Sequence, residues 1–122
     1  VDAGASHLIS QLFYDNADYL RFLDKARAAG IDVPIEAGIM PVTNAASVRR
    51  MTGMCSSKVP ERLATILDRW GDDPNTLKEA GIIYASVQIA DLVARGVDGI
   101  HLYTMNHPGV TRRTWQNVQG LF

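Results

Sequence analysis

Cysteine is almost absent from this sequence, which contains one, Cys55, among 122 residues. A single cysteine excludes an internal disulfide and a zinc site built from several cysteines, and it fits a reducing compartment, so we expect a cytoplasmic protein. We interpret Cys55 as a small hydrophobic residue rather than as a nucleophile, because the polar loop that follows it, residues 56–58, supplies no matched base.

Long hydrophobic runs and clusters of one charge are absent as well. No apolar run approaches the roughly 18 residues of a membrane span, and no segment resembles a signal peptide. The chain carries 12 Lys and Arg residues against 13 Asp and Glu residues, and these are scattered rather than gathered into a basic stripe that would neutralise phosphates. We therefore expect neither a membrane nor a nucleic acid as a partner.

The composition that remains is that of a packed domain. Hydrophobic residues make up 47% of the chain and charged residues 20%, which excludes a disordered or collagen-like protein. The sequence begins at Val1 without an initiator methionine, and residues 1–5 resemble the end of a helix closed by Gly4. We therefore expect residues 1–122 to be a fragment of a longer protein.

Three short runs rich in Ile, Val, Leu and aromatic residues predict strands at residues 7–14, 33–40 and 99–105. They do not alternate cleanly between apolar and polar residues, which suits strands of a parallel sheet that are buried on both faces. The segments between and after them carry helical patterns. The predicted order is strand, helix, strand, three helices, strand, helix, and this alternation indicates an α/β fold.

The helices are predicted from caps, stops and apolar stripes. Asp15 and Asn16 are candidate caps of a first helix that stops at Gly30 and places four residues on one face: Tyr19, Phe22, Leu23 and Ala26. Further helices are expected at residues 44–51, 60–70, 76–95 and 110–118, with a turn at 72–75. The longest of them carries one stripe of Ile83, Val87, Ala90 and Ala94, with Ile82, Ile89 and Leu92 beside it.

Five short motifs follow one another along the chain. They are Asp-Ala-Gly-Ala at residues 2–5, Gln-x-Phe-Tyr-Asp at 11–15, Gly-Ile-x-Pro at 38–41, Val-Pro at 59–60 and His-x-Tyr-Thr-x-Asn at 101–106. Each is weak alone, but all five stand in the order and approximate spacing of methylenetetrahydrofolate reductases. The whole sequence thus resembles that family.

The resemblance implies a TIM (β/α)8 barrel that carries FAD, accepts electrons from NADH or NADPH, and reduces 5,10-methylenetetrahydrofolate to 5-methyltetrahydrofolate. Such a barrel needs eight strands and about 250 residues. Residues 1–122 then form the C-terminal three strand-helix units, strands 6 to 8, of an incomplete barrel. The family's proton donor and most FAD contacts would lie before Val1, so we expect the isolated fragment to be inactive. A homo-oligomer is also expected.

The same resemblance implies a folate-facing wall at the ends of the strands. Gln11 matches the family glutamine that contacts the pterin, and an amide suits a pterin edge because it both donates and accepts hydrogen bonds; its alternative role is to satisfy loop backbone. Tyr103 is expected to pack in the barrel rather than to contact ligand, and Asn106 to hold the loop or the ligand. Met105 is expected either to face the flavin or substrate or to be ordinary core.

Two departures from the family pattern bear on ligand contacts. His107, followed by a proline, stands where the family often has an arginine for an anionic part of the folate, and Arg112 or Arg113 could replace that charge. Ser47 and Met51 stand where other members place a longer amide and an aromatic group. These departures leave the choice of reductant open.

Other candidates and other functions are weaker. His7 and His101 have no partner at metal-ligand spacing in the sequence and are interpreted as core or interface residues, and the acidic pair at residues 72–73 as part of a turn. Two alternative functions stay open. One is a non-enzymatic α/β module that associates through exposed sheet edges. The other is a different TIM-barrel enzyme of one-carbon metabolism.

Overall fold

The computed structural model describes residues 1–55 and 58–122, without the side chain of Cys55, so the predictions for that side chain and for residues 56–57 lie outside the described residues. The elements follow the predicted α/β order. They are β1 (Leu8–Ile9), α1 (Asn16–Ala28), β2 (Ile35–Ile39), α2 (Ala45–Cys55), α3 (Glu61–Trp70), α4 (Pro74–Ala94), β3 (Ile100–Leu102), α5 (Pro108–Val118) and a short 3-10 helix, η1 (Gln119–Leu121).

The strands form a parallel sheet of order β1-β2-β3, which confirms the predicted sheet type. All three strands are shorter than predicted. The β1 ladder ends where the Ser10 amide donates to the Glu36 carbonyl at 2.9 Å, and the chain beyond turns toward α1. Beyond β3, Met105 and Asn106 adopt positive φ angles of 47° and 60°, so the chain cannot continue as a strand past Thr104.

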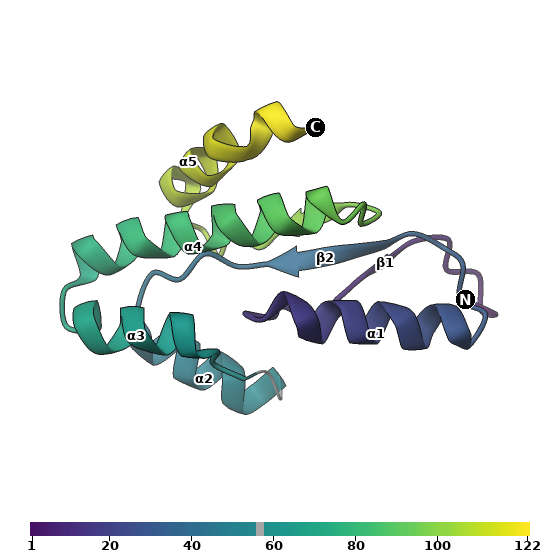
Figure 1. Cartoon of the computed structure of the whole chain (residues 1–122), viewed down its shortest axis with the longest axis horizontal. Helices are drawn as coiled ribbons and strands as arrows, with labels where there is room; N and C mark the ends of the chain where they lie inside the picture. Colours follow the sequence, from purple (N-terminus) through teal and green to yellow (C-terminus); the bar gives the residue numbers. More distant parts are fainter. Residues whose placement is uncertain (56–57) are drawn as a thin grey trace.

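One face of the sheet packs against helices α1, α4 and α5, which follow one another across it (Figure 1). The core between them is formed by ten buried residues: Phe13, Tyr19, Ala26, Ile35, Ala37, Ile39, Ala85, Ile89, Leu92 and Val118. On α4 it is therefore the second predicted stripe that is buried, while Ile83 and Val87 are 63% and 57% exposed. Phe22, expected on the buried face of α1, is 47% exposed because that face is centred on Tyr19 and Ala26.

A second core lies beyond the carboxyl ends of the strands, in the half of the molecule toward which the β2 arrow points and where α2 and α3 lie (Figure 1). It is built from Leu12, Tyr14, Met40, Val42, Ala45, Val48, Leu63 and Leu77. Gly81 of α4 makes this packing possible, since a Cβ atom there would lie 1.9 Å from the Val42 carbonyl oxygen. The loop after β2 therefore runs directly over the α4 backbone.

The helix ends follow capping chemistry, with three corrections to the predicted bounds. Asp15 caps α1 as expected, accepting from the Ala17 amide at 3.0 Å. Asp73 accepts from the Thr76 amide at 3.1 Å, so α4 starts at Pro74 and only the first half of the predicted turn at 72–75 stands outside it. Helix α2 continues past residue 51 to Cys55, and Pro60 is the N-cap of α3 rather than its first residue.

The amino end of the sheet is held by one ion pair. The Arg27 guanidinium donates to Asp98 at 2.6 Å and to the Val33 carbonyl at 2.9 Å. The same Asp98 oxygen accepts from the Ile35 amide, the first of β2, at 3.0 Å. These contacts join three segments at the amino end of the strands: the end of α1, the start of β2 and the turn before β3.

Candidate functional site

The predicted site residues gather at the carboxyl edge of the sheet. Parallel strands end at the same edge, and ligand sites of α/β folds lie there. The segments that follow β1, β2 and β3, residues 10–15, 40–44 and 103–107, all reach this edge. The sequence order of the strands therefore brings three distant segments together.

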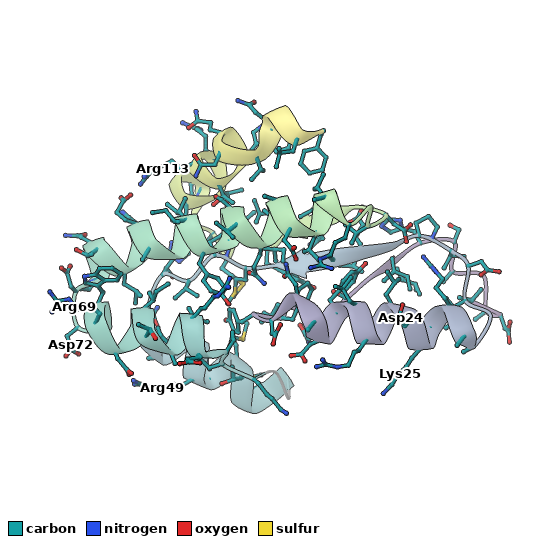
Figure 2. All side chains as sticks on the ribbon, in the orientation of Figure 1. Asp24, Lys25, Arg49, Arg69, Asp72 and Arg113 are labelled. Atoms are coloured by element: carbon teal, nitrogen blue, oxygen red, sulfur yellow. The ribbon has the colours of Figure 1, made fainter. Side chains whose placement is uncertain are left out.

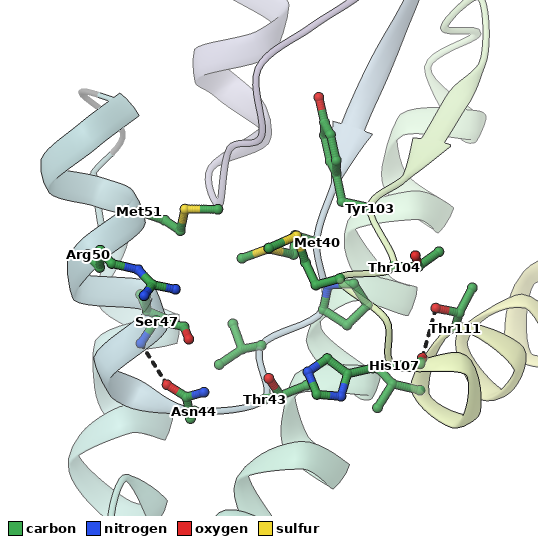
Figure 3. Close-up of a pocket in the computed structure, with 15 residues that line it drawn as sticks. Met40, Thr43, Asn44, Ser47, Arg50, Met51, Tyr103, Thr104, His107 and Thr111 are labelled. Atoms are coloured by element: carbon green, nitrogen blue, oxygen red, sulfur yellow. Dashed lines mark hydrogen bonds between the residues drawn. The ribbon is translucent and has the colours of Figure 1, made fainter.

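A cavity of about 230 Å³ opens between the loop after β2, helix α2 and the loop after β3 (Figure 3). Its walls include four of the six predicted site residues: Ser47, Tyr103, Met105 and His107. Gln11 and Asn106 do not line it. The structure therefore does not gather all the predicted site residues around one cavity.

Gln11 follows β1 and is exposed. Its side-chain oxygen accepts from the Leu12 amide at 3.0 Å, and its amide nitrogen makes no hydrogen bond to a described residue. The backbone around it is fixed more tightly. The Ser10 hydroxyl accepts from the Gly38 amide and donates to the Gln11 carbonyl, both at 2.9 Å. The position of Gln11 is therefore set by the neighbouring strand while its NH₂ group stays available.

Tyr103 completes this attachment from the third strand. Its hydroxyl donates to the Ser10 carbonyl at 3.1 Å, and its ring edge meets the His101 ring at a centroid distance of 4.7 Å. Gly38 leaves the necessary space, because a Cβ there would lie 2.8 Å from the Tyr103 ring. The hydroxyl of Tyr103 is therefore hydrogen-bonded to a backbone carbonyl, and its ring forms part of the cavity wall.

Met105 and Asn106 form the tip of a tight turn after β3. The His107 amide donates to the Thr104 carbonyl at 2.8 Å, and the two residues between them both have positive φ angles. Asparagine tolerates this conformation, whereas methionine rarely adopts it. The turn leaves the Met105 side chain 52% exposed beside the cavity and places Asn106 in the loop, outside the lining.

The segment after Gln11 is anchored on α4. The Tyr84 hydroxyl donates to the Tyr14 carbonyl at 2.6 Å, and burial raises the pKa of Tyr84 to about 12. The side chain of Asn16 donates to Asp91 at 2.8 Å and to the Gln88 carbonyl at 3.1 Å. The hydrogen bond from Asn16 holds the pKa of Asp91 below its usual value. These polar residues hold the loop and are not directed at the cavity.

Met40 and Arg50 line the cavity but were not among the predicted site residues. Met40 follows the last residue of β2 and is 7% exposed, so it lines the floor with its thioether. Arg50 lies on α2 one turn from Ser47, with its guanidinium directed into the cavity (Figure 3). The helical spacing of residues 47, 50 and 51 was the available signal, since positions three and four apart share a face.

His7 and His101, interpreted from the sequence as core or interface residues without a partner at metal-ligand spacing, both lie close to one carboxylate. On the face of the sheet that carries Ile9, the carboxylate of Glu36 lies 3.4 Å from His7 Nε2 and 3.7 Å from His101 Nδ1. The sequence could not show this, because His7 precedes β1 whereas Glu36 lies in β2 and His101 in β3. Among residues 1–55 and 58–122, no group of three His, Cys, Asp or Glu side chains is arranged to hold a metal ion.

The helices were also compared with the requirements of a membrane span. Within the part of the chain that the structure describes, none is both long enough and apolar enough to cross a bilayer. The longest, α4, has 21 residues and carries charged side chains at positions 78, 79 and 91.

Comparison with known proteins gives a consistent result. The family model described as methylenetetrahydrofolate reductase matches residues 1–119. The chain is 40% identical over 106 residues, 87% of its length, to methylenetetrahydrofolate reductase (NADH) 1 of Arabidopsis thaliana and to 5,10-methylenetetrahydrofolate reductase of Escherichia coli K12. It is 36% identical to methylenetetrahydrofolate reductase 1 of Schizosaccharomyces pombe over the same length. These matches span 18% of the plant and yeast proteins and 36% of the bacterial one.

Proposed function

The chain belongs to the methylenetetrahydrofolate reductase family, and from this premise we propose that it forms the folate-facing wall of a flavin-dependent reductase. In this proposal the reaction is the reduction of 5,10-methylenetetrahydrofolate to 5-methyltetrahydrofolate with NADH or NADPH. The family match over residues 1–119 favours this function over a non-enzymatic module or another barrel enzyme of one-carbon metabolism. The homo-oligomer and the cytoplasmic location stay predictions.

We propose that the three strand-helix units are strands 6 to 8 of a TIM barrel and that residues 1–122 are the C-terminal part of the catalytic domain. Two observations support this. Each strand pairs with the next one in the sequence, and helices α1, α4 and α5 all pack on one face of the sheet. In a doubly wound sheet, by contrast, the strand order reverses at one point and helices cover both faces. The opposite face, which carries Ile9 at 46% exposure, would then face the barrel interior.

The observation that carries the folate assignment is the state of Gln11. Its backbone is fixed by Ser10 and Gly38, and its amide NH₂ is exposed and makes no bond to a described residue. A preorganised amide can donate to and accept from the mixed edge of a pterin with little loss of conformational freedom. The adjoining cavity supplies an apolar wall of Met40, Met51 and Tyr103 that would exclude water from the bound folate.

FAD would supply the hydride when bound. Of the described residues only Met105 was expected to touch it, and its exposed thioether beside the cavity fits an apolar contact with a flat ring system. One such contact does not make a flavin site, so the role of this chain is to bind and orient the folate. We accordingly expect the isolated chain to be inactive.

The test is a pair of substitutions, Gln11→Ala and Gln11→Glu, in the complete reductase that contains this chain. Loss of the amide should lower kcat/KM for the folate by about tenfold or more, since a buried pterin edge would lose its partner. Oxidation of NAD(P)H by a quinone should change by less than about twofold because it needs no folate contact. Both half-reactions can be followed by absorbance.

Gln116→Ala is the matched control, because Gln116 is an exposed glutamine on α5 that does not line the cavity. It should leave both half-reactions unchanged. Equal losses in the two half-reactions of the Gln11 variants would contradict the pterin role. A complete protein without any folate turnover would contradict the proposed function itself.

A further inference from the structure

The cavity beside Gln11 has two chemically different ends. One end is apolar and includes Met40, Val48 and Met51, whereas the other presents hydroxyl, guanidinium and imidazole groups from Thr43, Ser47, Arg50, His107 and Thr111. None of the described residues that line it is an aspartate or a glutamate. A positively charged side chain in this cavity therefore has no carboxylate within the same walls to neutralise it.

Arg50 is that side chain. It extends from α2 into the cavity, and it forms no ion pair or side-chain hydrogen bond with any residue in the described ranges (Figure 3). Four other arginines of this chain do pair with carboxylates: Arg21, Arg27, Arg95 and Arg113. A guanidinium is always charged and presents a planar set of donors that matches carboxylate and phosphate oxygens.

His107 faces the same space from the opposite wall (Figure 3). Its backbone is held on both sides, by the Thr104 carbonyl at 2.8 Å and by the Thr111 amide at 3.1 Å, while its side chain makes no capping bond to α5. The backbone thus fixes the position of the imidazole ring, while the ring itself does not cap the helix. Helices α2 and α5, of 11 residues each, both begin at the cavity, and their amino ends add a favourable field for an anion.

The cationic residues suggested by the sequence lie elsewhere. Arg113 forms a two-pronged pair with Glu79 of α4, at 2.6 and 2.5 Å, and this pairing raises the pKa of Arg113. Neither Arg113 nor Arg112 lines the cavity. Of the arginines at positions 50, 112 and 113, only Arg50 lines the cavity.

We propose that Arg50, with His107 opposite, binds an anionic oxygen group of a ligand at the polar end of this cavity. The group is a carboxylate or a phosphate, and the inference rests on the proposed function, which offers both: the glutamate carboxylates of the folate and the phosphates of the nicotinamide nucleotide. Arg50 is then a binding residue that determines how tightly the ligand tail is held, while Gln11 contacts the ring.

The test compares Arg50→Gln with Arg50→Lys and with Arg49→Gln in the complete reductase. Arg49 is the matched control because it is the neighbouring arginine, points outward on the same helix and does not line the cavity (Figure 2). KM and kcat are measured for the folate, for a pterin lacking the glutamate tail, and for NADH and NADPH, each at low and high salt.

If the anion is the folate carboxylate, Arg50→Gln should raise KM for the folate about tenfold, leave kcat nearly unchanged and have no effect on the tail-less pterin. If it is the nucleotide phosphate, the same rise appears for the nicotinamide substrate instead. Arg50→Lys should recover part of the loss, and high salt should weaken the wild type toward the variant.

The inference is overturned when wild-type enzyme turns over folate normally and Arg50→Gln changes neither KM, or when Arg49→Gln has the same effect. A wild-type enzyme that does not reduce folate at all marks the failure of the proposed function, which is a different outcome. An equal effect of Arg50→Gln on folate and on the tail-less pterin would also overturn it, since a tail contact cannot act on a ligand that lacks the tail.

Discussion

The two ends of the sheet are held together by different means. At the amino end, two charged side chains hold the sheet: Arg27 donates to Asp98 and to the Val33 carbonyl, and Asp98 also accepts from the Ile35 amide. At the carboxyl end, the backbone is held by close approaches at Gly38 and Gly81 and by tyrosine hydroxyls that donate to carbonyl groups. Arg50 is left with no ion-pair partner among the described residues.

This difference shows how a small α/β unit keeps polar groups available for a ligand. A side chain whose hydrogen bonds complete the fold cannot also bind a ligand without loss of stability. Where glycines and hydroxyls fix the loops instead, the charged and amide groups beside them stay free. The comparison predicts that substitutions at the amino end change stability alone, whereas those at the carboxyl end change stability and ligand binding together.

The largest effect is expected for Gly81→Ala. Its new Cβ would meet the Val42 carbonyl oxygen at 1.9 Å, so α4 and the loop after β2 must move apart. Because Val42 also lines the cavity, we expect a loss of stability on the order of 3 kcal/mol together with a higher KM for the folate. Urea unfolding and steady-state kinetics of the complete reductase measure the two effects.

Gly53→Ala is the control for this change. Gly53 lies in α2, and a Cβ there would meet no atom within 4 Å. This substitution should stabilise the protein by about 0.5–1 kcal/mol through helix propensity. If Gly81→Ala were as harmless as Gly53→Ala, close backbone approach would not be what holds the carboxyl end.

A smaller effect is expected for Asp98→Asn at the amino end. The carboxylate accepts from both Arg27 and the Ile35 amide, so its loss weakens two charge-assisted bonds and should lower stability by about 2 kcal/mol. KM for the folate should stay within about twofold, because no residue of this ion pair lines the cavity. A changed KM would contradict the prediction that substitutions at the amino end of the sheet affect stability but not ligand binding.

Asp72→Asn is the matched control, since Asp72 is exposed and precedes the α4 cap. Surface substitutions of this kind are usually within about 0.5 kcal/mol of the wild type. A loss as large as that of Asp98→Asn would mean that net charge, rather than the Arg27 pair, is the cause.

The features of the fold that depend on short local patterns could be predicted from the sequence. Element order, the parallel sheet and the Asp15 cap follow from short runs of residues and from single cap positions. The buried stripe of α4 could not be chosen, because both faces of this helix are apolar and only the packing of α1 and α5 decides between them. Pairings across strands, such as that of Glu36 with the two histidines, were equally out of reach.

The residues of the candidate site also fall into two groups, those that a sequence motif indicates and those that only the packing brings to the cavity. Gln11, Ser47, Tyr103 and His107 could be proposed as site residues because their positions at strand ends or in motifs are visible in the sequence. The structure places the last three in the cavity wall, and the roles of all four stay predictions. Arg50 was missed because its place in the cavity depends on how α2 turns relative to the loop after β3. Asn106 was found for its motif, yet its positive φ of 60° places it in the turn and outside the cavity lining.

The smallest expected effect is that of Tyr84→Phe, and it depends on pH. Burial is the main cause that raises the pKa of Tyr84 from 10.0 to about 12 in the folded chain, with Asp15 adding to the shift and Arg62 opposing it. The folded state therefore holds this proton more tightly than the unfolded state. The resulting stability is fully present below pH 10 and is lost as the pH rises from 10 through 12.

At neutral pH the substitution removes the 2.6 Å hydrogen bond to the Tyr14 carbonyl, which should cost about 1 kcal/mol. Between pH 10 and 12 the difference between wild type and variant should shrink, because the wild type alone loses the contribution of this hydroxyl. Urea midpoints across this range measure the difference directly. Parallel curves would mean that the Tyr84 hydroxyl does not hold the loop after β1, and the carboxyl end would then depend on its glycines and on Tyr103.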